Sequence, residues 1–132
     1  MDPILKKLLY KGQEPVLFFD APPEMKGLEK AFRVKVRYTP EEVYPFVLAF
    51  VRDLDEGKWL GRKLPKFTDE TTVLWVAYPR GGSKKYESDY NRDSGHALME
   101  KHGYNGVSLV SLDNDWSAMR FKKAQKASPY HF

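Results

Sequence analysis

The residues with the clearest potential for chemistry lie together in segment 79–94, which reads PRGGSKKYESDYNRDS. It follows a predicted strand and runs into the start of a predicted helix. Its cationic side chains, glycine amides and helix N-terminus are all features that favour a bound anion. The segment therefore predicts a weak anion site. The candidate residues are Arg80, Gly81, Gly82, Ser83, Lys84, Asp89, Asn91 and Arg92.

A purely structural interpretation of the same segment stays open. Asp89 or Asn91 could cap the helix, because short polar side chains accept hydrogen bonds from the first free amides. Arg92 could pair with a nearby acid, and the glycines could simply turn the chain. The two interpretations differ in whether the polar groups face a ligand or one another.

A second polar cluster follows later in the chain and contains Asp113, Asp115, Trp116 and Arg120. One interpretation is a hairpin turn whose tryptophan places its ring in the core and bonds its N–H. The other places Trp116 and Arg120 beside segment 79–94 in a single ligand site. We therefore add both residues to the candidate site.

No catalytic residue and no metal ligand is predicted. Ser94 and His96 are two residues apart on a predicted helix, so their side chains diverge. His96 and His102 are six residues apart, which places them on different faces of that helix. No carboxylate cluster accompanies the histidines, so the sequence predicts neither nucleophilic catalysis nor a metal site.

Short apolar runs alternate with segments of helical character. Strands are expected near 16–20, 33–38, 46–51, 72–78, 106–112 and 116–122. Helices are expected near 23–31, 53–64 and 91–102, the last with Gly103 as its C-terminal glycine. The nearly unbroken apolar strands are typical of a parallel sheet that helices cover on both faces. The short turn 113–115 indicates an antiparallel hairpin.

These elements predict one α/β domain over 1–132 with a short irregular basic tail from about 124. The expected architecture is a three-layer αβα, Rossmann-like sheet of about six strands, mostly parallel with an antiparallel C-terminal hairpin. The chain has no cysteine and no apolar run of membrane-spanning length. We therefore expect a cytoplasmic protein with no membrane partner.

The net charge of +4 arises entirely in the second half of the chain. Residues 1–60 carry ten basic and ten acidic side chains, whereas 61–132 carry twelve and eight. Such asymmetry is compatible with an anionic partner, although a solvated basic face explains it equally simply. No recognition helix or aromatic RNA-binding string is present, which argues against nucleic acid.

Several strings resemble a known family. They are 16–23 (VLFFDAPP), 74–79 (LWVAYP), 83–93 (SKKYESDYNRD) and 113–121 (DNDWSAMRF). The chain resembles an uncharacterised family of small bacterial proteins, a domain of unknown function with a shortened methyltransferase-like Rossmann core. The resemblance implies the fold and the strand-pair ending, but no activity.

The turn after the first strand departs from working methyltransferases. A glycine-rich turn normally lets the backbone approach the cofactor there, whereas this chain reads Asp20-Ala-Pro-Pro-Glu24. Two prolines remove two amide donors and restrict the backbone. We therefore expect no S-adenosylmethionine (SAM) binding and assign no cofactor.

Three classes of function follow. The favoured one is a non-catalytic Rossmann-like ligand-binding or interaction domain that has lost the SAM-binding turn, with a small anionic ligand or a protein as its partner. The alternatives are an enzyme acting on a small anionic substrate and a nucleic-acid-binding domain. Fold alone does not choose among them.

Overall fold

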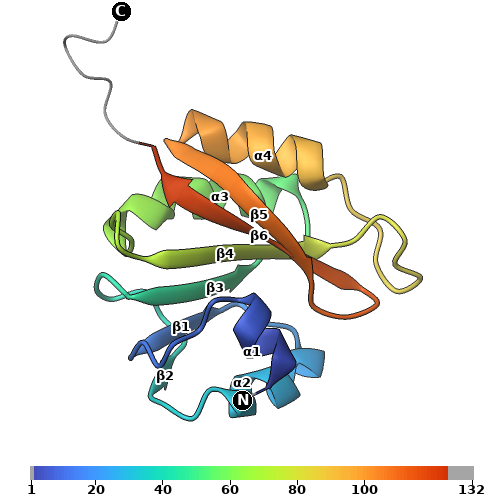
Figure 1. Ribbon diagram of the computed structural model, residues 1–132. Coiled ribbons are helices and arrows are strands. Elements are labelled where there is room, and N and C mark those ends of the chain that lie inside the picture. Colours follow the sequence, from blue (N-terminus) through green and yellow to red (C-terminus); the bar gives the residue numbers. More distant parts are fainter. Residues whose placement is uncertain (1, 125–132) are drawn as a thin grey trace, which may run out of the picture.

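A computed structural model describes residues 2–124 and contains one mixed sheet in the order β2-β1-β3-β4-β6-β5 (Figure 1). The strands are β1 (Val16–Phe19), β2 (Val36–Arg37), β3 (Phe46–Phe50), β4 (Val73–Pro79), β5 (Tyr104–Ser111) and β6 (Trp116–Lys123). The strands β2, β1, β3 and β4 are parallel, while β6 runs antiparallel to both β4 and β5. The predicted fold class is confirmed.

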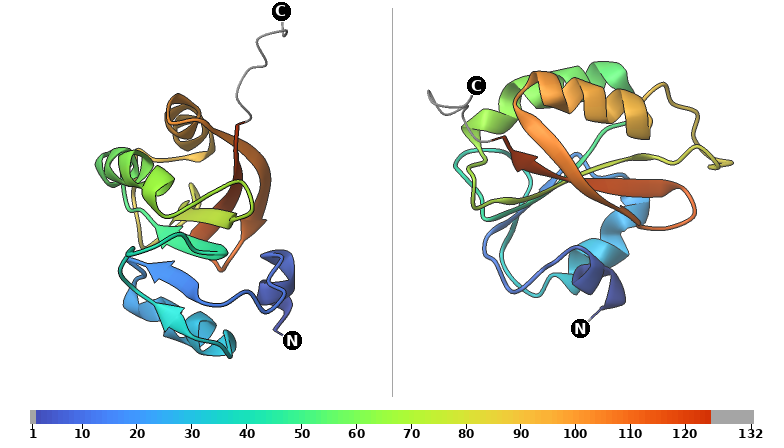
Figure 2. Two further views of the ribbon diagram at one scale, coloured as in Figure 1. Left: turned by 90° about the vertical axis from the view of Figure 1, so that its left-hand side faces the viewer. Right: turned by 45° about the horizontal axis from the view of Figure 1, so that its top comes forward.

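Helices cover both faces of the sheet and make it the middle of three layers (Figures 1 and 2). The helices are α1 (Pro3–Lys7), η1 (Pro23–Met25), α2 (Lys26–Ala31), α3 (Leu54–Lys63), η2 (Leu64–Lys66) and α4 (Arg92–Lys101). The pair α3 and α4 packs on one face, and α1 with η1 and α2 packs on the other. The short helix α1 was not predicted.

The central strands are buried on both faces, as their unbroken apolar sequences predict. In β3 the side chains of Val47 and Ala49 join the core under α3 and α4. The alternate residues Phe46 and Leu48 join the core under α1 and α2. Because neither face meets water, both sets of side chains are apolar.

Local signals fix the two long helices. Asp53 caps α3 by accepting a hydrogen bond from the Glu56 amide at 2.9 Å. The Asn91 side chain caps α4 by accepting hydrogen bonds from the amides of Asp93 and Ser94, and the Ser94 hydroxyl oxygen accepts one from the Asn91 amide. The helix α4 ends as predicted, with Gly103 in the left-handed region at φ +88°.

The two outer strands differ from their predicted lengths. The strand expected near 33–38 is reduced to Val36–Arg37, paired with β1 at two positions only. The strand β5 instead begins two residues before the predicted start, immediately after Gly103. The predicted basic tail from about 124, with Lys126, falls largely outside the described residues.

Within residues 2–124, none of the helices has both the length and the apolar character that a membrane crossing requires.

Candidate functional site

The strand order reverses between β1 and β3, which sets the expected place of a ligand crevice. The chain moves from β1 outward to β2 and then returns to the other side of β1 as β3. In open parallel sheets, ligands lie beyond the carboxyl ends of the strands at such a switch point. Here those ends are Asp20, after β1, and Arg52, just after β3.

Arg52 spans this crevice. One guanidinium nitrogen, Nη1, donates to the Asp20 carbonyl at 2.7 Å and lies 3.2 Å from the Asp20 carboxylate. The same nitrogen lies 3.7 Å from the carboxylate of Glu56 on α3. The guanidinium carbon is 6.0 Å from the ring centroid of Trp116. A side chain of the protein itself thus fills the place between the two strand ends.

The backbone around Arg52 is held as well. Its amide donates to Glu56 Oε1 at 2.8 Å, and its carbonyl accepts from the Ser88 hydroxyl at 2.7 Å. The first bond joins the strand end to α3, and the second joins it to the loop after β4. Arg52 therefore has its main chain fixed from both sides.

The turn after β1 provides few donors to a ligand. Asp20 has a left-handed φ of +58°, a conformation that glycine adopts more easily. Pro22 is extended and Pro23 opens η1, and neither residue has a backbone N–H. The turn therefore has proline rings at positions where a cofactor-binding turn has backbone N–H donors.

Glu24 links this turn to two later parts of the chain. Its Oε2 accepts from the Tyr86 hydroxyl, from Trp116 Nε1 at 3.2 Å and from Lys85 Nζ at 3.4 Å. Burial alone would raise the pKa of Glu24, but these hydrogen bonds outweigh it and lower that pKa to about 2. Glu24 is therefore an ionised carboxylate with three donors already around it.

A small aromatic cavity of about 330 Å³ lies beside Arg52. It is lined by Phe19, Asp20, Phe50, Val51, Glu56, Trp59 and Leu60. The Trp59 ring stacks on that of Phe19 with centroids 5.6 Å apart, and 41% of Trp59 remains exposed. This stack leaves the indole at the rim of the crevice, whereas Trp75 and Trp116 are fully buried.

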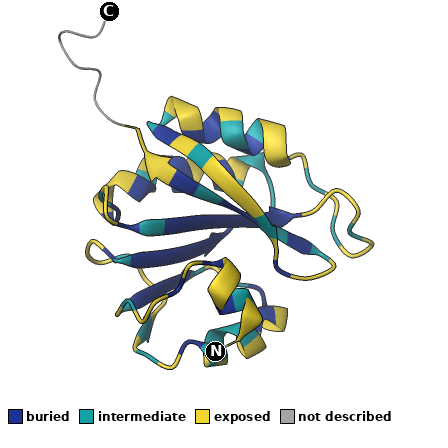
Figure 3. Cartoon of the chain, in the orientation of Figure 1, coloured by how far each residue is buried: buried dark blue, intermediate teal, exposed yellow. Residues whose placement is uncertain are grey.

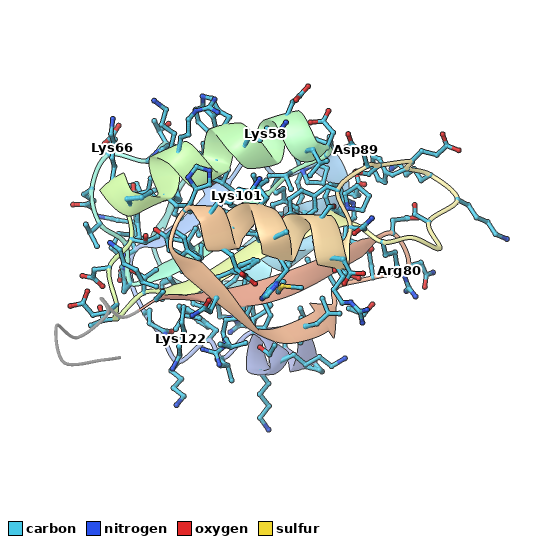
Figure 4. All side chains as sticks on the ribbon, turned by 90° about the horizontal axis from the view of Figure 1, so that it is seen from above. Lys58, Lys66, Arg80, Asp89, Lys101 and Lys122 are labelled. Atoms are coloured by element: carbon cyan, nitrogen blue, oxygen red, sulfur yellow. The ribbon has the colours of Figure 1, made fainter. Side chains whose placement is uncertain are left out.

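A larger cavity of about 730 Å³ lies under the loop after β4. Its charged lining residues are Asp53, Arg80, Glu87 and Asp89. Figure 4 places Arg80 and Asp89 on this loop, at the side of the molecule beyond the start of α4. The cavity is roomy and polar, and carboxylates outnumber cations in its lining.

The predicted site residues at the start of the loop mostly bond to the turn before β6. The Ser83 hydroxyl donates to the Asp115 carboxylate at 2.8 Å, and Arg80 Nη1 reaches the Asp113 carbonyl at 3.4 Å. Gly81 and Gly82 form an open turn in which an added Cβ would touch nothing. Lys84 is exposed. This half of the loop is tied to the hairpin, as a polar turn would be.

The residues at the end of the loop bond to helix termini. Asp89 accepts from the Leu54 amide at 2.8 Å, so it helps to start α3 rather than α4. Asn91 caps α4, and Arg92 pairs with its neighbour Asp93 at 3.3 Å. The structural interpretation thus accounts for these contacts. The anion-binding interpretation stays a prediction.

Of Trp116 and Arg120, only Trp116 lies beside the loop: its ring packs edge-on against that of Tyr86, with centroids 5.1 Å apart. Trp116 is fully buried, with its N–H on Glu24. Arg120 lies further along β6, where its Nε donates to Ser108 on β5 at 3.4 Å. The described residues contain no group of three or more His, Asp or Glu side chains that could hold a metal ion.

Two residues that shape the crevice, Arg52 and Glu24, were missed by sequence reasoning. A single arginine after an apolar strand has no distinctive pattern, and its partners are separated from it in the chain. Glu24 was visible only as the end of the proline turn. The one available signal was Arg52-Asp53 at the end of the third apolar run, where ligand-facing residues of such sheets gather.

Comparisons with known proteins give fold but no family. A scan against protein-family models finds no match, and neither does a search of curated proteins. Among solved structures, a SAM-dependent methyltransferase from Aquifex aeolicus is similar with TM-score 0.60 and 12% identity, over 92% of this chain and 88% of that one. A protein from Pyrococcus horikoshii OT3 gives TM-score 0.59 and 7% identity, over 92% and 87%.

LepI, solved in complex with SAM, matches with TM-score 0.53 and 13% identity over 91% of this chain. This chain spans only 39% of LepI's length. At such identities the likeness shows a Rossmann-like methyltransferase fold and nothing finer. The resemblance to a family of small bacterial proteins stays a prediction.

Proposed function

We propose that this protein is a non-catalytic ligand-binding or interaction domain on a methyltransferase-like scaffold, with its cofactor crevice filled by its own side chains. The observation that carries the proposal is the position of Arg52. Its guanidinium joins Asp20 and Glu56 across the switch point. Function on a widely shared fold is decided by such local chemistry.

A cofactor entering the crevice would have to displace Arg52. Displacement would leave the carbonyl and the carboxylate of Asp20 without the Arg52 guanidinium, while Glu56 would keep the hydrogen bond from the Arg52 amide. Because all three side chains are partly exposed, water would replace much of the lost interaction, so the penalty is only about 1 kcal/mol. This penalty weakens binding by less than about tenfold and does not exclude a ligand by itself.

The proline turn adds a second, independent obstacle. SAM-type ligands depend on backbone donors at the end of the first strand. Pro22 and Pro23 cannot donate, and the Glu24 carboxylate that follows is already engaged. Each missing hydrogen bond to a polar ligand atom costs about 1–3 kcal/mol, which is larger than the penalty for moving Arg52.

Calorimetric titration with SAM and S-adenosylhomocysteine tests the proposal. We expect no saturable heat at millimolar ligand for the wild type, for Arg52→Ala, or for Arg62→Ala, an exposed arginine of α3 that serves as the matched control. Arg52→Ala is expected to gain little because the prolines remain. Micromolar binding by the wild type would overturn the proposal.

A further inference from the structure

The strand β5 forms an open edge of the sheet. It is last in the strand order, and among residues 2–124 its one strand partner is β6. Figure 3 shows most of its length in the colour of exposed residues. An edge strand presents a row of unpaired N–H and C=O groups, which is a template for another strand.

This edge has no charged residue of its own, and its one irregularity is a register shift against β6 between Gly106 and Ser108. Its sequence over 104–111 is YNGVSLVS, without a single charge or proline. The opposite edge strand, β2, is two residues long and contains Arg37, with Lys35 just before it. A short, charged edge resists further pairing, whereas a long, uncharged one invites it.

Two apolar side chains of β5 are presented to solvent. Val107 is 45% exposed and Leu109 is 46% exposed. Behind them α4 packs closely on the strand, since a Cβ added at Gly106 would collide with the His96 ring. The strand is therefore held in place by a packed helix, and its two exposed apolar side chains are available to contact a partner.

The charges around β5 favour a second copy of this chain as the partner. Lys122 and Lys123 pair with the first residues of β5, and Lys101 ends the adjacent helix α4. Asp113 and Asp115 follow the other end of β5, close to Arg80. Figure 4 shows Lys101 and Lys122 toward the end of the molecule away from Arg80. If two copies of β5 paired antiparallel, the lysine end of each copy would lie against the aspartate end of the other. The favourable charge contact would therefore occur at both ends of the interface.

We propose that β5 pairs antiparallel with β5 of a second copy, which joins the two sheets across a twofold axis near the middle of the strand. Such an interface is isologous, because the same patch serves on both chains. Its backbone bonds would complete the open edge, and the second copy would cover the exposed side chains of Val107 and Leu109.

Sedimentation equilibrium of the full chain tests the assembly. We expect a mass near twice the 15.4 kDa of one chain, with a dissociation constant that rises with salt as the end charges are screened. The double variant Val107→Lys, Leu109→Lys should be a monomer with unchanged circular dichroism. Val43→Lys is the matched control, because Val43 is 48% exposed and lies in the loop before β3. It should stay dimeric.

Cysteine crosslinking tests the pairing itself, since the chain has no cysteine of its own. Ser108→Cys lies near the proposed axis and should form an intermolecular disulfide under mild oxidation. Asn105→Cys is the control: at about 3.3 Å per residue, the two copies of position 105 would be roughly 16 Å apart, too far for a disulfide.

The proposal is overturned by a wild-type monomer at high micromolar concentration. A dimer that survives the double lysine variant, or that crosslinks through position 105 as readily as through position 108, also overturns it. A dimer of the double lysine variant would place the interface elsewhere on the protein. Crosslinking through position 105 would show that the two strands pair in another register.

Discussion

The two hollows at the carboxyl edge of the sheet are built in opposite ways. At the switch point between β1 and β3, Arg52 lies among Asp20, Glu56 and Trp116, and the protein's own charges satisfy one another. Under the loop after β4, a cavity of about 730 Å³ stays open, and its polar rim bonds outward to helix ends and to the hairpin turn.

The difference shows where a ligand could enter this scaffold. The switch-point crevice holds the Arg52 guanidinium and a proline turn with few backbone donors. The loop cavity beside it has room but no converging cations. One region is occupied by the protein's own charged side chains, and the other retains open space.

The largest expected effect concerns the anchor of the loop. The Tyr90 ring is 2% exposed and lies against α4, where a Cβ at Gly95 would collide with it. We expect Gly95→Ala to lower the free energy of unfolding by about 1–3 kcal/mol, because a buried ring cannot move aside cheaply. Chemical denaturation measures it.

Gly27→Ala is the matched control on α2, where an added Cβ would meet nothing within 4 Å. It should be neutral or stabilise the protein by up to about 1 kcal/mol through helix propensity. Equal effects of the two substitutions would show that Tyr90 does not fix the loop cavity.

The sequence was a good guide to elements and a poor guide to contacts. All six strands and the three longer helices were predicted. The central strands could be predicted because a strand that is buried on both faces has an almost continuous apolar sequence. Sequence reasoning did not place β6 between β4 and β5, since both arrangements give the same hairpin. It also named Asn91 as a cap without choosing between that role and a ligand.

Residues that act through distant partners were the ones missed. Arg52 meets Asp20 from 32 positions away, and Trp116 meets Glu24 from 92. No local pattern records such pairs. Arg92 looked equally suited to an anion, but in the structure it pairs with the adjacent Asp93.

A pH experiment sharpens the role of Glu24, which joins the crevice turn to the loop. Its pKa is about 2 in the folded chain against an ordinary 4.5, so it stabilises the fold above pH 4.5. That contribution should disappear as the pH falls from 4.5 to about 2. We expect Glu24→Gln to lower the free energy of unfolding by about 1–2 kcal/mol at neutral pH. The difference in free energy of unfolding between the variant and the wild type should then shrink as the pH falls from 4.5 to about 2.

Denaturation of both proteins from pH 7 to pH 2 checks this expectation. The difference between them isolates Glu24 from the other carboxylates that titrate in the same range. A constant difference across the whole range would show that the bonds from Tyr86, Trp116 and Lys85 do not favour the ionised form.

The smallest expected effect is that of a bound anion at the loop. Sulfate at a concentration equal to its dissociation constant stabilises a folded protein by about 0.4 kcal/mol. If the predicted site exists, sulfate should raise the melting temperature above that in chloride of equal ionic strength, and Arg80→Ala should remove the rise. Arg62→Ala is the control, because Arg62 is an exposed arginine of α3 that lies outside both the predicted anion site and the lining of the loop cavity. No sulfate-specific rise in the wild type rules the anion site out.

The most direct test of the filled crevice is the NMR signal of the Arg52 side-chain Nη–H groups, followed while SAM is added to the wild type. An arginine whose Nη1 is fixed between Asp20 and Glu56 should give a resolved, slowly exchanging Nη–H signal whose shift does not change at millimolar SAM. A signal that moves and saturates with the ligand would show that Arg52 yields to a cofactor. The crevice would then be a working binding site.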